Sequence, residues 1–245
     1  MFDFSGRYAV VTGGAKGIGE ATVRRLIADN AYGVAILDII NSESLAKELD
    51  PSGRKVLPLL CDISDRTAVA AAFRTIYVHF GRVDFMINNA GIAKDNYFHA
   101  LKDEEWDSVF DVNLKGAYNC TKQVIGQMRK QESGRIIFFS SIAIYGIERE
   151  CNYSATKGAL YALTKNLARE QIDKNITVNC VIPGPIETDL FRYVSGEQAD
   201  NTKQTDIPRQ RIGQPKDVAS LICYLCTDEA YFINGARIDI NGGIS

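Results

Sequence analysis

The sequence predicts an α/β fold in which seven parallel strands form one doubly wound sheet with helices on both faces. Short apolar runs, typical of buried strands, alternate with longer amphipathic runs, typical of helices, along nearly the whole chain. Such alternation favours a parallel sheet that is covered on both sides. The 245 residues, 46% of them hydrophobic, are enough for one sizeable core, and no Pro/Gly/Ser-rich linker divides them. We therefore expect a single domain over residues 1–245.

Seven apolar runs are the expected strands: residues 8–12, 33–38, 56–62, 83–90, 134–141, 177–184 and 236–240. Helix-length stretches separate most of them, for example residues 18–30 and 65–81. The first six strands and their crossovers would make two mononucleotide-binding halves, which is the plan of a Rossmann-like fold. Residues 189–210 break this rhythm because they are polar and weakly periodic. We expect a substrate lid there, with an ordinary exposed helix and loop as the alternative.

Composition excludes several classes of function. The net charge of -2 gives no basic footprint for nucleic acid, and no apolar run approaches the roughly 20 residues that span a bilayer. The N-terminus lacks the basic-then-apolar order of a signal peptide. Six scattered cysteines indicate free thiols in a reducing compartment, and two isolated histidines, His79 and His99, argue against a metal site. We expect a cytoplasmic protein with neither a nucleic-acid nor a membrane partner.

A glycine-rich turn, TGGAKGIG, follows the first expected strand and precedes a helix. Gly13, Gly17 and Gly19 would let the backbone approach a pyrophosphate, and the helix N-terminus would offer free N–H groups to it. The spacing is wider than the usual dinucleotide fingerprint. Alone the signal is weak, because many glycine turns are only tight turns.

The ends of the next strands strengthen this reading. Asp38 ends the second strand 19 residues after Gly19, the distance at which an acid meets a ribose diol. Its carboxylate would repel a 2′-phosphate, so NAD is favoured, although Lys16 in the glycine loop leaves NADP as the alternative. Asp62 and Asn89 end the third and fourth strands and suit the adenine and its ribose. Turn chemistry is the competing reading for both.

Tyr153 and Lys157 are four residues apart and would share one face of a helix. An ammonium near a phenol lowers the phenol pKa from its usual value of about 10, so the phenol would exchange a proton near neutral pH. The pair alone is common. Ser140, at the end of the fifth strand, and Asn113, a poor helix former in a helical stretch, support the catalytic reading.

Eight segments, taken in order along the chain, resemble the motifs of one known family. They are TGGAKGIG, the strand end at Asp62, NNAG, DVNLKG, SSIAIYG, YSATK, PGPIETDL and INGARIDINGG. Over nearly its whole length the chain resembles the short-chain dehydrogenase/reductase family. Within it, the motifs are most similar to 3-oxoacyl-acyl-carrier-protein reductases and related secondary-alcohol dehydrogenases.

The resemblance implies a role for each matching residue. Tyr153 would be the general acid/base, and Lys157 would hold the nicotinamide ribose and depress the phenol pKa. Asn113 would position a water, and Ser140 would orient the substrate carbonyl. Ser141 is the alternative serine, because the family's first glycine after this serine is replaced by alanine here. Spacing to Tyr153 and to the glycine at position 146 favours Ser140.

The same resemblance implies the cofactor set and the assembly. The cofactor residues would be Gly13, Lys16, Gly17, Ile18, Gly19, Asp38, Asp62, Ile63, Asn89, Ala90, Gly91, Tyr153, Lys157, Pro183, Gly184, Ile186 and Thr188. A homotetramer is implied. We expect an oxidoreductase that transfers hydride between NAD and a small-molecule secondary alcohol or ketone. The alternatives are an NADPH-dependent 3-oxoacyl-acyl-carrier-protein reductase and a non-catalytic sensor of NAD(H).

Overall fold

The computed structural model describes residues 1–195 and 207–244. Its centre is one seven-stranded sheet in the order β3-β2-β1-β4-β5-β6-β7, and every strand pair is parallel. This confirms the predicted fold class. The strands are β1 (Tyr8–Thr12), β2 (Gly33–Asp38), β3 (Val56–Leu60), β4 (Phe85–Asn88), β5 (Gly134–Phe139), β6 (Ile176–Pro183) and β7 (Arg237–Ile240).

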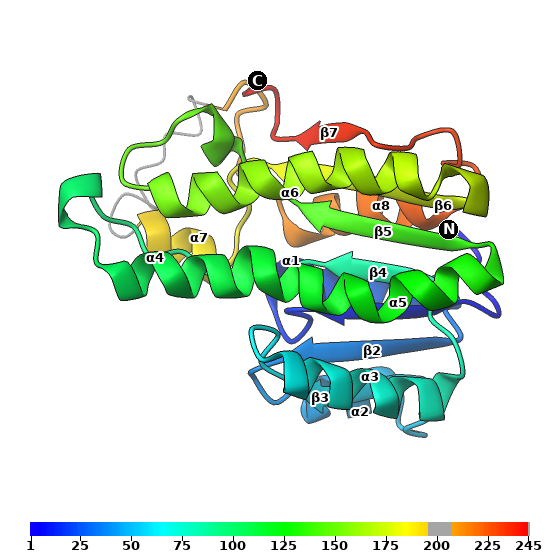
Figure 1. Ribbon diagram of the computed structural model, residues 1–245. Helices are drawn as coiled ribbons and strands as arrows, with labels where there is room; N and C mark the ends of the chain where they lie inside the picture. The colour runs from blue at the N-terminus through cyan, green and yellow to red at the C-terminus, as the bar shows by residue number, and fades with distance from the viewer. Residues whose placement is uncertain (196–206, 245) are drawn as a thin grey trace.

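Helices cover both faces of the sheet (Figure 1). One face carries α1 (Gly17–Ala28), α2 (Glu43–Leu49) and α8 (Pro215–Cys226), whose buried side chains pack in one apolar cluster. The other face carries α3 (Arg66–Phe80), α5 (Ala117–Gln131) and α6 (Cys151–Glu170), which pack in a second cluster. Each cluster is buried because strands such as β2 and β5 are apolar on both sides.

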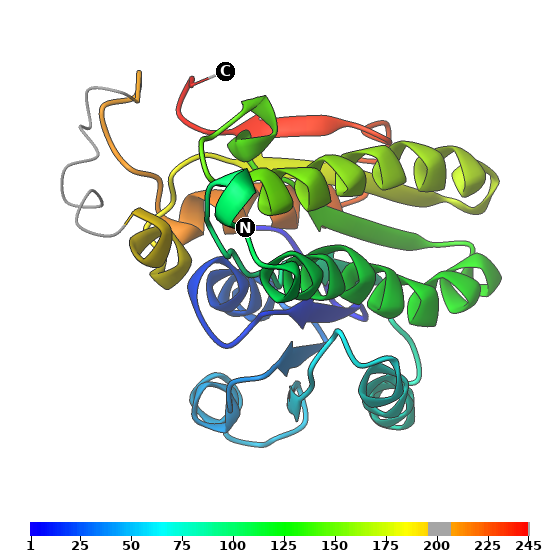
Figure 2. The ribbon, with the colours of Figure 1, turned by 60° about the vertical axis from the view of Figure 1, so that its left-hand side comes forward.

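Shorter helices surround the carboxyl ends of the strands (Figure 2). They are α4 (Asp103–Phe110), α7 (Asp189–Ser195), two 3-10 turns (Phe98–Ala100 and Ile142–Tyr145) and a π-helical segment (Asp111–Gly116) between α4 and α5; a third 3-10 turn (Ile172–Lys174) lies at the opposite edge, just before β6. Within the expected lid, α7 forms its first part, and residues 196–206 lie outside the described residues. No helix in the described ranges is long and apolar enough to cross a membrane.

Three strands end two residues earlier than the apolar runs predict, and β5, which ends at Phe139, is one of them. β3 stops at Leu60 and β4 at Asn88, because the chain then turns into loops that carry polar side chains. Pro58 lies on β3, which is an edge strand, where its missing N–H removes no bond from a neighbour. The strand order reverses between β1 and β4, and the crevice of a doubly wound sheet lies at the carboxyl ends beside that reversal.

Candidate active site

The first two turns of α6 bring Tyr153 and Lys157 to the carboxyl edge of the sheet. The ammonium nitrogen of Lys157 lies 5.2 Å from the centre of the Tyr153 ring, a cation–π arrangement. It also donates a hydrogen bond of 3.0 Å to the carbonyl oxygen of Phe139, the last residue of β5. Lys157 is 3% exposed. The helical spacing predicted from the sequence therefore does place the two side chains together.

The two serines after β5 have different partners. The Ser140 hydroxyl is buried and donates a 2.9 Å hydrogen bond to the carbonyl oxygen of Lys157. The Ser141 hydroxyl instead hydrogen-bonds with the Tyr153 phenol, which lowers the phenol pKa, and accepts from the backbone N–H of Ala143. In the structure it is Ser141, and not Ser140, whose hydroxyl acts on the Tyr153 phenol, and which of the two serines is catalytic stays a prediction. Consecutive residues of an extended chain point to opposite sides, and Ser141 is the one that faces Tyr153.

Asn113 lies in the π-helical segment, a form of helix that occurs often at functional sites. Its side-chain oxygen accepts from the backbone N–H of Ile92, and its amide nitrogen donates to the Ile92 carbonyl and to the Thr156 hydroxyl. These bonds tie the loop after β4 to α6. The poor helix propensity that singled out Asn113 thus marks a local change of helix type.

Burial dominates the electrostatics of the catalytic pair. It raises the pKa of Tyr153, the charges of Glu150 and Asp95 raise it further, and the Ser141 hydrogen bond opposes them. Burial also lowers the pKa of Lys157 to about 8. The expected lowering of the phenol pKa by Lys157 is not seen. The ammonium lies over the ring and bonds to a carbonyl instead of to the phenol oxygen.

Two carboxyl groups that the sequence reading missed lie near Tyr153. Glu150 is 9% exposed, and burial together with the charge of Asp95 raises its pKa to about 7. Burial likewise raises the pKa of Asp95, while the charge of Arg149 opposes that rise. The available signal was an acid three residues before Tyr153, since residues i and i+3 share a helix face.

The glycine turn and the end of β2 meet as predicted. The Asp38 carboxylate accepts hydrogen bonds from the backbone N–H groups of Ala15 (2.9 Å) and Ile40 (3.0 Å), so it lies against the glycine turn. Gly13 and Gly17 have φ of +64° and +60°, a region that favours glycine. A Cβ on Gly19 would lie 2.0 Å from the carbonyl oxygen of Gly13. The turn therefore requires its glycines, and Ile18 lies between Gly17 and Gly19 in the first turn of α1.

The segment after β6 reaches the same turn from the other side. A Cβ on Gly17 would lie 3.3 Å from the Thr188 side chain, so the two segments are close neighbours. Thr188 accepts from the backbone N–H of Phe191 at the start of α7 and donates to the Ile186 carbonyl. Lys16 forms a 2.7 Å ion pair with Asp189. Pro183 and Gly184 lead from β6 into this segment.

The strand ends at Asp62 and Asn89 make local contacts. Asp62 is exposed and accepts from the backbone N–H and hydroxyl of Ser64, which is turn chemistry. Asn89 donates to the carbonyls of Thr12 and Gly13 and so supports the glycine turn. Ile63 is buried. The adenosine contacts assigned to these residues remain predictions.

These residues fit a nicotinamide dinucleotide. The first turn of α1 has no side chain capping its N–H groups, which suits a pyrophosphate. A Cβ on Gly91 would lie 3.4 Å from the Lys157 ammonium, so glycine keeps the approach to this group open. Ala90 and Gly91 form the loop wall between the glycine turn and Lys157. The free N–H groups at the start of α1 therefore suit the pyrophosphate, and the open approach at Gly91 suits the nicotinamide end of the cofactor.

The raised pKa of Glu150 predicts a pH-dependent stability. The folded chain keeps the Glu150 proton from its ordinary pKa of 4.5 up to about 7, so ionisation in that range favours unfolding. Glu150→Gln removes this cost, and the variant should gain stability relative to the wild type between pH 5 and pH 8, by up to about 3 kcal/mol. Urea denaturation at both pH values measures it. Exposed Glu148 supplies the control, Glu148→Gln, and an equal offset at both pH values would contradict the prediction.

Comparisons with known proteins agree with this geometry. The family model described as enoyl-(acyl carrier protein) reductase matches residues 13–245. The 3-oxoacyl-[acyl-carrier-protein] reductase of Thermotoga maritima is 38% identical over 242 residues, with 98% of each chain covered. The reductase of the same name from Salmonella typhimurium is 36% identical over 243 residues, again with 98% of each chain covered.

Solved structures of enzymes match the whole fold. Levodione reductase superposes with a TM-score of 0.92 at 30% identity, with 98% of each chain covered. A short-chain dehydrogenase/reductase from Brucella melitensis described as a glucose/ribitol dehydrogenase gives a TM-score of 0.92 at 30% identity, covering 100% of this chain and 98% of its own. With its tyrosine and lysine on one helix beside a glycine-rich turn, the chain belongs to the short-chain dehydrogenase/reductase family, and it is an oxidoreductase that acts on alcohol or ketone groups with a nicotinamide cofactor.

Proposed function

We propose that the enzyme interconverts a small secondary alcohol and its ketone with NAD, using Tyr153 as the proton donor and acceptor. The arrangement around the phenol carries this proposal: Ser141 hydrogen-bonds with it and Lys157 lies over its ring. When bound, the nicotinamide ring accepts or supplies the hydride. Ser141 orients the substrate oxygen, Lys157 holds the nicotinamide ribose, and Asn113 keeps the loop after β4 in position.

The electrostatics suit ketone reduction near neutral pH. Because burial and two carboxyl groups raise the pKa of Tyr153, the phenol holds its proton and is ready to give it to a nascent alkoxide. Alcohol oxidation needs the phenolate and is therefore favoured at alkaline pH. An intact proton donor also argues against a non-catalytic sensor, which has no use for one.

Replacing the phenol separates an enzyme from a sensor. Tyr153→Phe removes the proton donor, so kcat should fall by roughly 10²–10⁴ while the ring packing and NADH binding persist. NADH fluorescence and steady-state rates with a panel of secondary alcohols and ketones measure the two effects. A variant with full activity would refute the mechanism.

Alanine variants of the two serines form a matched pair that tests which serine orients the substrate. Ser141→Ala removes the group that orients the substrate oxygen and should lower kcat by about 10²-fold. Ser140→Ala should keep most of the activity and lose about 1 kcal/mol of stability, because it breaks only the bond to the Lys157 carbonyl. Rates and urea denaturation of both variants test the assignment. If Ser140→Ala is the inactive variant, the assignment to Ser141 is wrong.

The environment of Asp38 supports NAD as the preferred coenzyme. Its carboxylate lies against the glycine turn, where it accepts a ribose hydroxyl and repels a 2′-phosphate. Lys16, which would otherwise attract that phosphate, is paired with Asp189. The cation that argued for NADP thus already has an anionic partner.

Neutralising this acid should shift the coenzyme preference. Asp38→Asn keeps the size of the side chain and removes its charge, so the ratio of kcat/KM for NADP to that for NAD should rise by about tenfold or more. Both coenzymes are compared at one saturating substrate concentration. A wild type that already prefers NADP would contradict our assignment.

The curated relatives make NADPH-dependent reduction of a 3-oxoacyl carrier substrate the second candidate. Carrier docking requires exposed cations for an acidic partner. Arg129 and Lys174 have the suitable charge, but Arg129 bonds to Gln171 and Lys174 pairs with Glu132. These contacts favour a small free substrate, and activity with a 3-oxo thioester and NADPH would favour the carrier substrate instead.

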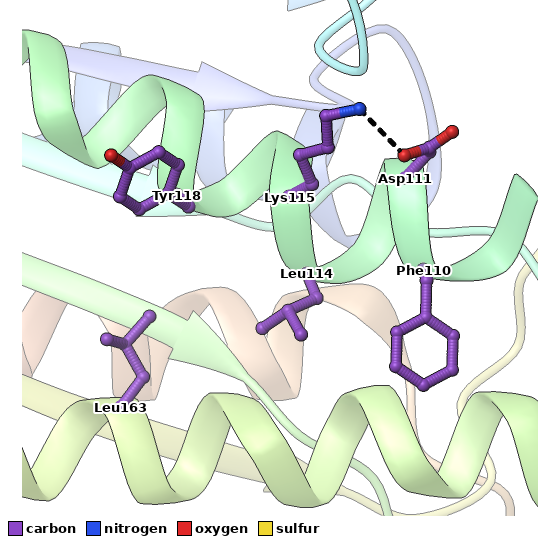
Figure 3. A pocket seen from close by; sticks show the side chains of 6 residues that line it. All are labelled: Phe110, Asp111, Leu114, Lys115, Tyr118 and Leu163. Carbon is purple, nitrogen blue, oxygen red and sulfur yellow. Dashed lines mark hydrogen bonds and ion pairs between the residues drawn. The ribbon is translucent and has the colours of Figure 1, made fainter. Parts of the chain in front are cut away.

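A second copy of the chain is the proposed occupant of a groove between the π-helical segment, α5 and α6. Phe110, Leu114 and Leu163 point into it, and Tyr118, 45% exposed, closes one end (Figure 3). Lys115 pairs with Asp111 at the rim. An apolar groove with a polar rim is typical of protein interfaces, and it supports the homotetramer.

We also propose that the enzyme is located in the cytoplasm.

Charge in the groove should disrupt this assembly. Leu163→Lys places an ammonium among the apolar side chains and should give smaller species in analytical ultracentrifugation. Val78→Lys on α3 is the control, because Val78 is 89% exposed and lies outside the groove. A wild type that sediments as a monomer would contradict the proposed assembly.

A further inference from the structure

Acid, phenol and amine follow one another along the start of α6. Glu150 precedes the helix, Tyr153 is three residues later, and Lys157 is four residues after that. Residues at these spacings share one helix face. Gly91, one of the expected cofactor residues, lies close to the Lys157 ammonium. Glu150 therefore flanks the phenol on the side away from Lys157, which we take to be the side of the substrate.

The Glu150 side chain is largely buried, and its carboxyl group has no partner among the described residues. Its side chain is 9% exposed, and among the described residues it makes no hydrogen bond and no ion pair. Its backbone alone is bonded, to Ile147 and to Ser154. A carboxyl group that is largely withdrawn from water and has no hydrogen-bond partner is costly, and a ligand that donates to it would remove that cost.

Asp95 adds a second unsatisfied acceptor. Its Oδ1 atom is buried and has no hydrogen-bond partner among the described residues. Two bonds hold its loop against the start of α6: the N–H of Asn96 donates to the Arg149 carbonyl, and the Asn152 side chain donates to the Lys94 carbonyl. The charges of Asp95 and Glu150 both act on Tyr153, so all three groups lie together.

The charged neighbours do not neutralise this pair. The Arg149 guanidinium lies 5.7 Å from the centre of the Tyr97 ring and forms no ion pair within the described ranges, although its charge acts on Asp95. Lys94 is exposed. Lys157, on the far side of Tyr153, bonds to the Phe139 carbonyl. The substrate side of the phenol is therefore acidic and rich in free acceptors.

We propose that Glu150, supported by Asp95, is a specificity-determining residue that binds a hydroxyl group next to the reacting carbon and rejects substrates with an anion there. This deepens the proposed function and rests on it. A neutral hydroxyl donates to the buried acceptors and removes the cost of leaving them unpaired. A carboxylate or phosphate at the same place meets like charge.

Three small alcohols test this selection because they share one reacting group. Butan-2-ol has no second polar group, butane-2,3-diol adds a neutral hydroxyl, and 3-hydroxybutyrate adds a carboxylate. The ratios of kcat/KM between them cancel the contributions of Tyr153, Lys157 and the coenzyme, which all three substrates share. The wild type should prefer the diol to butan-2-ol by about tenfold, and 3-hydroxybutyrate should be the poorest substrate.

Two variants of Glu150 separate charge from hydrogen bonding. Glu150→Leu should abolish the preference for the diol. Glu150→Gln should keep that preference and improve the use of 3-hydroxybutyrate relative to butan-2-ol by about tenfold. In the wild type alone, rejection of 3-hydroxybutyrate should strengthen from pH 6 to pH 8.5 as Glu150 ionises. Glu148→Gln, in the same loop but exposed, should leave all ratios unchanged.

The outcomes distinguish this inference from the proposed function. If the wild type oxidises these alcohols but Glu150→Gln has the same ratios as the wild type, the specificity role is overturned and the dehydrogenase assignment stands. Glu150→Gln alone decides this point if Glu150→Leu fails to fold. If the wild type oxidises none of the three with either coenzyme, both the proposed function and the role of Glu150 are overturned.

Discussion

Two hydrogen bonds in opposite directions hold the catalytic helix to the sheet. The Lys157 ammonium donates to the last carbonyl of β5, and the Ser140 hydroxyl donates to the carbonyl of Lys157. Both groups are buried, so rotating or sliding α6 would leave a charged donor or a hydroxyl without a partner. The same constraint fixes Tyr153 at the carboxyl edge of the sheet. The roles assigned to the phenol depend mainly on the Lys157 bond, the charged one of the two.

The attachment also sets the proton chemistry. Burial drives the phenol and the ammonium in opposite directions, raising the pKa of Tyr153 and lowering that of Lys157. Both groups are thereby drawn toward their neutral forms. Ser141 is the neighbour that favours the phenolate, and the acids at positions 95 and 150 disfavour it. The balance keeps a proton on the phenol, which fits the reductive direction at neutral pH.

The fold itself does not choose the substrate. Proteins as different as a levodione reductase and reductases of acyl carrier substrates match this chain over nearly its full length. The substrate and the coenzyme are selected by side chains at the carboxyl edge of a sheet that these proteins share. In the function that we propose, Asp38 and the Lys16–Asp189 ion pair act on the coenzyme, and the two acids beside Tyr153 act on the substrate. These groups lie at the ends of strands and helices and in the loops between them, where side chains vary without disturbing the sheet.

The sequence by itself determined the sheet, the glycine turn and the Tyr153–Lys157 pair. Strands buried on both faces read as continuous apolar runs, and helical spacing places residues four apart on one face, so both features are local. Tertiary structure decided which serine meets the phenol, because neighbouring residues of an extended chain diverge and counting along the chain does not give their direction. It also decided the meeting of Asp95 with Glu150 and of Lys16 with Asp189, whose partners are far apart in sequence and are joined only by the packing of loops at one edge of the sheet.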